Sequence, residues 1–239
     1  MLNNINTEKI LFLDIETVPM QYSFSELDDR SKDLWNKKTV FLQKRDEKNA
    51  EEIYNMAGIY AEFGKIVCIS VGFIAQINGE EQIRLKSFAS EDEKILLQEF
   101  IDLLNSKFNN ESFMLCAHNG KEFDYPFLSR RILINGLKLP LLLDIAGKKP
   151  WEIRHLDTME LWKFGDYKNY TSLDLLTHIF NIPTSKDDID GSQVAKVYYE
   201  DKDLERIIIY CEKDVIATIQ LFRKYKGQDI INNDFIKSV

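Results

Sequence analysis

The sequence predicts an α/β fold whose central sheet is mixed, and three observations carry this prediction. A solid apolar run at Ile10–Leu13 is typical of a strand buried on both faces. Two β-rich runs flank Asn78-Gly79, a dipeptide that favours a tight hairpin. Helical patterns then alternate with short apolar runs, as in parallel strands joined through helices. An antiparallel hairpin beside parallel strands makes the sheet mixed.

The first strand is followed by a long polar segment, residues 20–62. Apolar residues recur there at spacings of three, four and seven among many charges, which predicts one or two amphipathic helices inserted before the next strand. Neither an internal repeat nor a low-complexity linker interrupts the chain, so we expect residues 1–239 to form a single domain that carries this mainly helical insertion.

The hairpin is expected from residues 65–76 and 82–89. Ser90 and Glu93 then have the spacing of a capping box, which predicts a helix that runs through Leu104.

The rest of the chain continues the alternation of strands and helices. Residues 112–117 read as a short strand, 123–135 as a helix, and 153–157 as a further short strand. Three helical stretches close the chain: about 172–180, about 191–199 and the strongly amphipathic 203–223.

Composition and charge exclude several classes of protein. The three cysteines occur singly in apolar runs, without a CxxC pair, so they indicate core residues in a reducing compartment. The polar start has no signal-peptide pattern and no long apolar span follows, so we expect a cytoplasmic protein without a membrane contact. The net charge of −8 argues against a protein that coats nucleic acid through a basic surface. It does not exclude an enzyme that grips a few nucleotides.

Two carboxylates stand two residues apart at the end of the first strand, Asp14 and Glu16. Positions i and i+2 of a strand share a face, so both side chains project together while Ile15 points to the other side. Adjacent anions beside a buried strand repel each other and lose hydration unless a cation lies between them, and a hard divalent cation suits oxygen ligands. Alternatively, the pair simply marks the strand's exit into a loop at Thr17.

A further acid, Asp124, follows the strand and turn that end at His118-Asn119-Gly120. In doubly wound sheets ligands bind outside the carboxyl ends of strands, and Asp124 lies at such an end. Its other explanation is a carboxylate that complements the dipole of a helix N-terminus.

The last helix carries Tyr210 and Asp214 at positions i and i+4, on one face with Ile207 and Ala217. That face is the apolar one, and an acid on the buried stripe of a helix needs a partner. Asp214 is therefore a third candidate for a functional carboxylate.

Together these motifs resemble a known family. DxE at Asp14–Glu16, NxxxFD at Asn119–Asp124 and YxxxD at Tyr210–Asp214 are similar to the three motifs of the DEDDy 3′–5′ exonucleases. The chain most resembles the proofreading exonuclease domain of family B DNA polymerases, in particular bacterial proteins that carry this domain alone. The stretches LFLDIETVP, AHNGKEFDYPFLSRR, LDTMELWKFG, IDGSQV and YCEKDV support the likeness, which covers nearly the whole chain.

The resemblance implies a ribonuclease H-like fold with a central mixed five-stranded sheet flanked by helices. It also implies that Asp14, Glu16, Asp124 and Asp214 hold two divalent cations, Mg²⁺ or Mn²⁺, and that Tyr210 orients the attacking water. A phenol with a pKa near ~10 is a poor base at neutral pH, so Tyr210 is expected to orient the water without deprotonating it. Ile209 stands where the histidine subclass has its histidine, which favours the tyrosine subclass.

By the same resemblance, Thr17, Asn119, Lys121 and Phe123 are candidate contacts to nucleic acid, although Phe123 could equally be a core aromatic. Further cations that could reach phosphates are Arg130, Arg131, Lys148, Lys149 and Lys163. Asp157 could support the site or cap the end of its strand, and His155 reads as structural.

The expected activity is removal of nucleotides from the 3′ end of single-stranded DNA, which is a more probable substrate than RNA on this likeness. A polymerase or repair protein would be a separate partner. Two alternatives stay open: an exoribonuclease of the ribonuclease D type, and a nucleic-acid-binding module with weak catalysis.

Overall fold

The structure is a computed structural model that describes residues 2–166, 170–184 and 188–238. Its centre is a sheet of six strands in the order β5-β4-β1-β2-β3-β6. The strands are β1 Ile10–Pro19, β2 Gly64–Ile77, β3 Glu80–Ala89, β4 Met114–Ala117, β5 Leu156–Asp157 and β6 Ile236–Ser238. β2 runs antiparallel to β1 and β3, whereas β4, β5 and β6 are parallel to the strands they join. The predicted α/β class with a mixed sheet is confirmed.

The sheet has one strand more than the five expected, because β6 pairs with the outer edge of β3. β6 is only three residues long and aligns Ile236 with Ile83. A segment so short has no periodicity that a sequence pattern could reveal.

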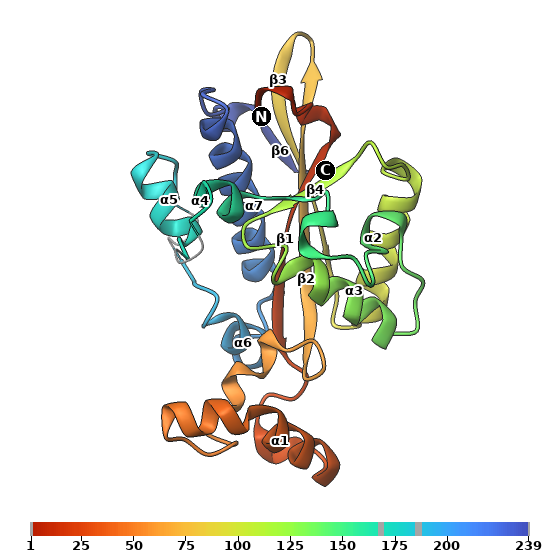
Figure 1. The fold of residues 1–239 in the computed structure, drawn as a ribbon, viewed down its shortest axis with the longest axis vertical. Coiled ribbons are helices and arrows are strands. Elements are labelled where there is room, and N and C mark those ends of the chain that lie inside the picture. Colours follow the sequence, from red (N-terminus) through yellow and green to blue (C-terminus); the bar gives the residue numbers. More distant parts are fainter. Residues whose placement is uncertain (1, 167–169, 185–187, 239) are drawn as a thin grey trace.

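Helices cover both faces of the sheet, with α7 on one face and α2 and α3 on the other (Figure 1). The α-helices are α1 Asp29–Asp46, α2 Glu93–Lys107, α3 Asp124–Ile134, α4 Thr158–Lys163, α5 Leu173–Ile179, α6 Val194–Lys196 and α7 Leu204–Tyr225. A π-helix, Val197–Asp201, continues α6, and short 3₁₀ helices occupy Leu2–Asn4, Thr7–Lys9, Phe24–Glu26, Tyr54–Ile59, Leu141–Leu143, Pro150–Glu152 and Asn233–Phe235. Among the described residues, none of these helices combines the length and the apolar character needed to cross a lipid bilayer.

β1 lies at the centre of the sheet, and its side chains alternate between two cores. Leu11, Leu13 and Ile15 enter the core that α2 and α3 cover. On the opposite face, Phe12 packs edge-on against Phe222 of α7, with ring centroids 5.6 Å apart. This alternation points the next two residues of the second face, the acids of β1, toward α7.

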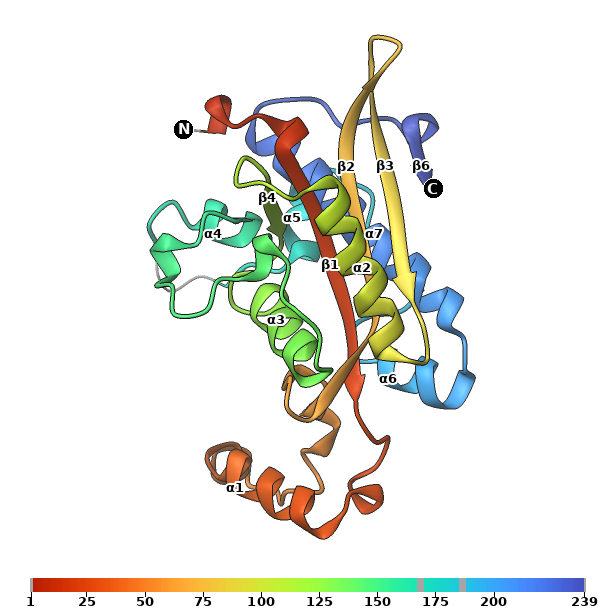
Figure 2. The same ribbon diagram turned by 90° about the vertical axis from the view of Figure 1, so that its right-hand side faces the viewer.

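The neighbours of β1 differ in length. β2 pairs with it from Phe12 to Pro19, whereas β4 pairs only with Ile10–Phe12. The half of β1 that carries the acids therefore extends past the end of β4, and α3 begins beside this open edge (Figure 2). The shorter strand leaves room for side chains to approach the middle of the sheet.

The segment between β1 and β2 contains α1 and the 3₁₀ helix Tyr54–Ile59, and it lies at the far end of β1 (Figure 1). It has its own apolar cluster around the fully buried Trp35, whose Nε1–H donates to the Ala50 carbonyl at 2.7 Å. Gly58 presses this segment onto β1, because a Cβ there would lie 3.2 Å from the carbonyl carbon of Val18.

The capping box predicted at the start of α2 is wrong. Asp92 is the N-cap, and its carboxylate accepts the Lys94 N–H. Glu93 is instead 7% exposed and forms a bidentate ion pair with Arg131 of α3, which excludes Arg131 from contact with phosphates. Glu93 also accepts the Ile66 N–H at 2.7 Å, so it joins α2, α3 and β2. The spacing of Ser90 and Glu93 predicted a local capping interaction, but Glu93 instead pairs with Arg131, which is distant in sequence.

Two other predicted elements are shorter than expected. The strand at 153–157 begins only at Leu156, and a 3₁₀ turn at Pro150–Glu152 precedes it in the chain. The helix at about 191–199 starts at Val194 and becomes a π-helix at Val197.

His155 is structural, as expected, and it joins β4 to the loop after α3. Its Nδ1 accepts the Leu115 N–H at 3.1 Å, so its Nε2 carries the proton that is donated to the Leu142 carbonyl at 2.6 Å. Burial is the main cause that lowers the pKa of His155 to about 4.

We predict that His155 makes stability fall in acid. Because the folded-state pKa is depressed, the unfolded chain binds the proton first as the pH falls from about 6.5 to 4. The stability advantage of wild type over His155→Gln should therefore be complete above pH 6.5 and shrink by about 3 kcal/mol toward pH 4.

Urea unfolding of both proteins at several pH values measures this difference, and titrations that the two proteins share cancel. A wild-type advantage that does not change between pH 7 and pH 4 would contradict the assignment.

Candidate active site

Asp14 and Glu16 lie side by side on the face of β1 that α7 covers, where they align with Ser70 and Cys68 of β2. The two carboxyls share a hydrogen bond. One ligand atom from each of them and the Cys211 sulfur lie within 4.8 Å of one another. The arrangement on one strand face is the one that the i, i+2 spacing predicts.

Asp124 lies in the first turn of α3, is 3% exposed, and is close enough for its charge to act on Asp14 and Glu16. Burial raises its pKa to about 8, although a hydrogen bond with the Ile15 backbone lowers it. That bond is possible because Ile15 lies beyond the part of β1 that β4 covers. The Asp124 Oδ1 atom is buried and has no hydrogen-bond partner among the described residues. A buried, unpartnered carboxylate oxygen is costly and is a suitable ligand for a cation.

α7 brings Tyr210 and Asp214 to the site, one turn apart and 6% and 9% exposed. Burial is the main cause that raises the pKa of Tyr210 above its usual range, followed by the charges of Asp214, Glu16 and Asp14. A hydrogen bond with Asp214 acts in the same direction. The phenol is therefore protonated at neutral pH and can donate a hydrogen bond.

The four acids interact electrostatically. Burial raises the pKa values of Asp14 and Glu16 well above their usual range, and the charge of Asp214 is the next cause for both. Asp124 raises them further. Carboxyls from β1, α3 and α7 thus share a desolvated site that favours protons or divalent cations over free anions. The oxygen-rich donor set and the unpartnered Oδ1 fit a hard cation such as Mg²⁺ or Mn²⁺.

Cys211 is a member of the site that sequence reasoning assigned to the core. Its thiol donates to the Asp14 Oδ2 at 3.3 Å and approaches the Asp14 carbonyl oxygen at 3.4 Å. Burial raises its pKa, so the sulfur stays protonated and serves as a hydrogen-bond donor to the carboxylate. The signal in the sequence that could have identified Cys211 as part of the site was its position directly after Tyr210.

The loop before α3 is held by Asp157. Its carboxylate accepts the backbone N–H groups of Asn119 at 3.0 Å and Lys121 at 3.1 Å. It also caps α4 at the end of β5. Asn119 adopts a left-handed φ of 65°, and the next residue must be glycine, because a Cβ at Gly120 would lie 2.5 Å from that of Ala117.

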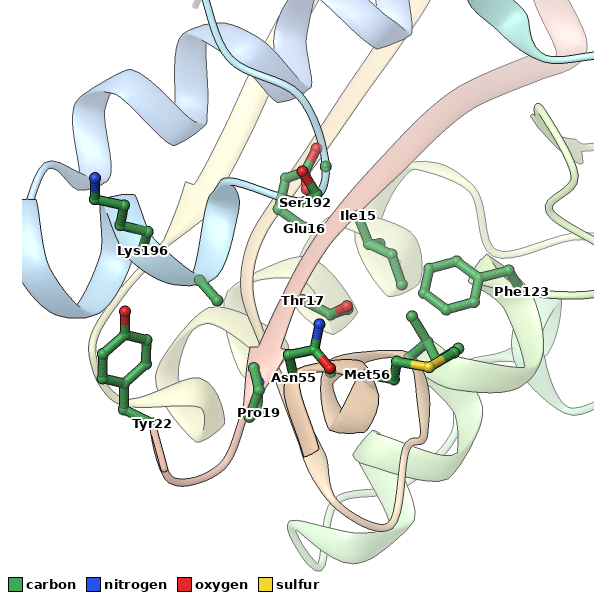
Figure 3. A pocket seen from close by; sticks show the side chains of 14 residues that line it. Ile15, Glu16, Thr17, Pro19, Tyr22, Asn55, Met56, Phe123, Ser192 and Lys196 are labelled. Atoms are coloured by element: carbon green, nitrogen blue, oxygen red, sulfur yellow. The ribbon is translucent and has the colours of Figure 1, made fainter. Parts of the chain in front are cut away.

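A cleft of about 560 Å³ opens beside Glu16. Two of the predicted nucleic-acid contacts, Thr17 and Phe123, line it (Figure 3). Lys121 does not: its ammonium group pairs with Glu160 at 2.5 Å. Asn119 is half-buried in the loop, and its Oδ1 has no hydrogen-bond partner among the described residues.

Sequence reasoning missed other residues that line this cleft, among them Tyr22, Asn55, Met56 and Lys196. They come from the segment after β1 and from α6. Helical spacing predicted Met56 to lie on the apolar face of a helix, and no motif marked these four residues as part of a cleft.

The chain belongs to a family described as a predicted 3′–5′ exonuclease related to the exonuclease domain of PolB, whose model matches residues 59–233. The matched segment includes Asp124, Tyr210 and Asp214, whereas Asp14 and Glu16 precede it. The mixed sheet flanked by helices agrees with the ribonuclease H-like exonuclease fold that the motifs imply.

Similar proteins include DNA polymerases of archaea. The chain is 25% identical to DNA polymerase 1 of Pyrococcus abyssi over 183 residues, 69% of this chain and 23% of the polymerase. It is 23% identical to a DNA polymerase of Pyrococcus glycovorans over 146 residues, 56% of this chain and 18% of the polymerase. The chain thus spans less than a quarter of the length of these relatives.

We predict that Asp124 destabilises the metal-free protein at high pH. Its folded-state pKa is raised from 3.8 to about 8, so the folded state retains a proton that the unfolded chain loses, and stability falls as the pH rises through this window. Asp124→Asn should therefore be more stable than wild type by about 5 kcal/mol at pH 8 in chelator, with a difference below about 1 kcal/mol near pH 4.

Unfolding curves in EDTA at both pH values measure the effect, and Mn²⁺ added at pH 8 should narrow the gap by stabilising wild type. An Asp124→Asn protein that is less stable than wild type in EDTA at pH 8 would contradict the prediction.

Proposed function

We propose that the protein is a metal-dependent 3′–5′ exonuclease that removes nucleotides from the 3′ end of single-stranded DNA. The observation that carries this proposal is the electrostatic coupling of four desolvated acids, Asp14, Glu16, Asp124 and Asp214, the second of which lines a cleft. Three separate segments place acids where burial opposes them, which a bound dication would compensate. Membership of a family of predicted 3′–5′ exonucleases supports the same activity.

The residues that would hold two divalent cations are Asp14, Glu16, Asp124 and Asp214. Such a pair of cations supplies charge that activates water and stabilises both the attacking and the leaving oxygens of a phosphoryl displacement. The unpartnered Oδ1 of Asp124 offers a free ligand atom, and the Cys211 thiol fixes the direction of the Asp14 carboxylate.

Tyr210 would orient the attacking water. Its raised pKa keeps the phenol protonated, which rules it out as the base at neutral pH and leaves it as a hydrogen-bond donor. Its hydrogen bond with Asp214 holds the phenol beside the acids. Because a phenol has one O–H proton, that proton would have to turn from Asp214 to the water in order to orient it.

DNA is proposed as the substrate because the relatives found by comparison are DNA polymerases. A single strand is proposed because Phe123 and Thr17 line a cleft of about 560 Å³ beside Glu16 that could receive unpaired nucleotides.

We expect the protein with Mn²⁺ to shorten a 5′-labelled single strand into a ladder, and a 3′-labelled one to release the label as a mononucleotide. EDTA should stop both reactions, and Asp14→Asn or Asp214→Asn should slow them by roughly 10³-fold because each removes a cation ligand.

Gel analysis of matched DNA and RNA strands is the measurement, with circular dichroism to verify that each variant is folded. Faster loss of the RNA strand would assign the enzyme to RNA, and strands that are bound but stay intact would refute the nuclease.

Tyr210→Phe should lower the cleavage rate by roughly 10²-fold, because it removes one oriented hydrogen-bond donor. The affinity of the Tyr210→Phe variant for Mn²⁺ should stay within about twofold of wild type, since the phenol is not among the proposed metal ligands. Single-turnover cleavage and calorimetric Mn²⁺ titration separate the two effects. An unchanged rate would remove Tyr210 from the mechanism.

A further inference from the structure

The loop between α3 and β5 presents an aromatic ring and several cations to solvent. Trp151 is 80% exposed, whereas the other two tryptophans are buried or half-buried. Lys148, Lys149 and Arg154 are exposed on the same stretch. The only acid within this stretch is Glu152, so the loop is cationic in a chain whose net charge is −8.

The turn that carries Trp151 is held in place by its own residues. The Glu152 carboxylate accepts the Lys149 N–H at 2.6 Å, and Pro150 begins the 3₁₀ helix with its restricted φ. The acid is therefore used inside the turn, and Lys148 and Lys149 form no ion pair among the described residues. An indole on an ordered turn has little backbone freedom to lose on binding a partner.

A cavity of about 170 Å³ adjoins this turn, and Lys148 and Arg154 line it. Its apolar lining includes Phe113 and Leu142. Phe113 packs edge-on against Phe108, with ring centroids 5.0 Å apart, so this lining rests on the core. Sites for whole small molecules usually measure about 300–1,000 Å³, so this cavity suits only part of a nucleotide, such as one base.

Two acids also line the cavity, Glu111 and Asp144, and both are exposed. Glu111 approaches Arg154 at 3.8 Å, but the two side chains are 84% and 60% exposed. An ion pair this long and this exposed contributes little free energy, so a phosphate could replace the carboxylate beside Arg154.

The turn leads directly to the loop of the candidate active site. β5 is an edge strand of the sheet, and Asp157 at its end accepts the Lys121 N–H. Arg154 is three residues before Asp157, so the two Cα atoms are at most about 10 Å apart. Besides burial, the charges of Lys121, Lys148 and Arg154 each lower the pKa of His155, so these cations surround one side chain. A stacked strand rises about 3.4 Å per nucleotide and would cover this distance in about three nucleotides.

An exposed aromatic ring among cations suits single-stranded nucleic acid better than a duplex. Unpaired bases offer their faces to an aromatic side chain, whatever the sequence, while cations contact the phosphates. In a duplex those faces are covered by neighbouring base pairs, so Trp151 would have nothing to stack on.

We propose that the turn at residues 148–154 is a second contact for the single strand, where Trp151 stacks on a base upstream of the 3′-terminal nucleotides and the neighbouring cations contact phosphates. The proposal rests on the proposed exonuclease function and adds a preference for strands long enough to reach the turn. The described residues that line the cavity and those that line the cleft beside Glu16 do not overlap.

The test compares two fluorescent oligothymidylates, one of about 3 and one of about 12 nucleotides, of which only the longer reaches the turn. Anisotropy titrations in EDTA give both affinities without cleavage. The ratio of the longer to the shorter should fall roughly tenfold in Trp151→Ala, because one stacked base is lost. Trp151→Phe keeps a ring and should restore the ratio to within about twofold of wild type.

The matched control is Phe41→Ala, which truncates another exposed aromatic side chain, 76% exposed, on α1. It should keep the wild-type ratio. For the longer strand, Lys148→Gln should reduce the slope of log affinity against log salt by about 0.7, whereas Lys94→Gln on α2 should not.

A ratio that Trp151→Ala leaves unchanged overturns the second contact and leaves the exposed turn to a protein partner. Cleavage with Mn²⁺ distinguishes this failure from that of the exonuclease itself. Strands that are cut, but whose affinity does not depend on Trp151, refute the second contact alone. Strands that are bound with the Trp151-dependent preference for length but stay uncut refute the nuclease and leave the second contact standing.

Discussion

The unequal lengths of β1 and β4 are the constraint on which the site depends. β4 covers only Ile10–Phe12, so the acid-bearing half of β1 has an open edge in the middle of the sheet. Asp124 occupies that edge and bonds to the backbone of Ile15, where a longer β4 would have placed a strand partner. The same truncation delivers the loop around Asn119 to the site, because the chain leaves the sheet at Ala117.

The acids oppose the stability of the fold that positions them. Apolar packing on both faces of β1 and the ion pair between Glu93 and Arg131 hold the surrounding elements together. That packing offsets the free-energy cost of gathering desolvated carboxyls. A bound cation would lower this cost. The residues proposed as metal ligands, among them Asp14 and Asp124, are thus residues that oppose the stability of the metal-free fold.

Periodicity predicted much of the fold and the local geometry of the site. The i, i+2 spacing of Asp14 and Glu16 and the i, i+4 spacing of Tyr210 and Asp214 each define one face, and both faces are as expected. Spacing could not predict that β1, α3 and α7 meet, which required the motif resemblance. It also failed for Met56 and Lys196, because the helical spacing of their segments does not show which elements meet to form the cleft. Spacing likewise could not predict β6, because this short strand is defined by its pairing with β3, which is distant in sequence.

The segment between β1 and β2 separates the first strand from the rest of the molecule in sequence, although β1 is central in space. A fragment of residues 59–239 would retain the whole segment that matches the family. It would nevertheless lack the middle strand of the sheet, both acids of the DxE motif and the Trp35 cluster. The segment that matches the family and the segment that is needed to complete the sheet therefore have different boundaries. Cutting the chain at the start of the family match would remove β1 from the sheet.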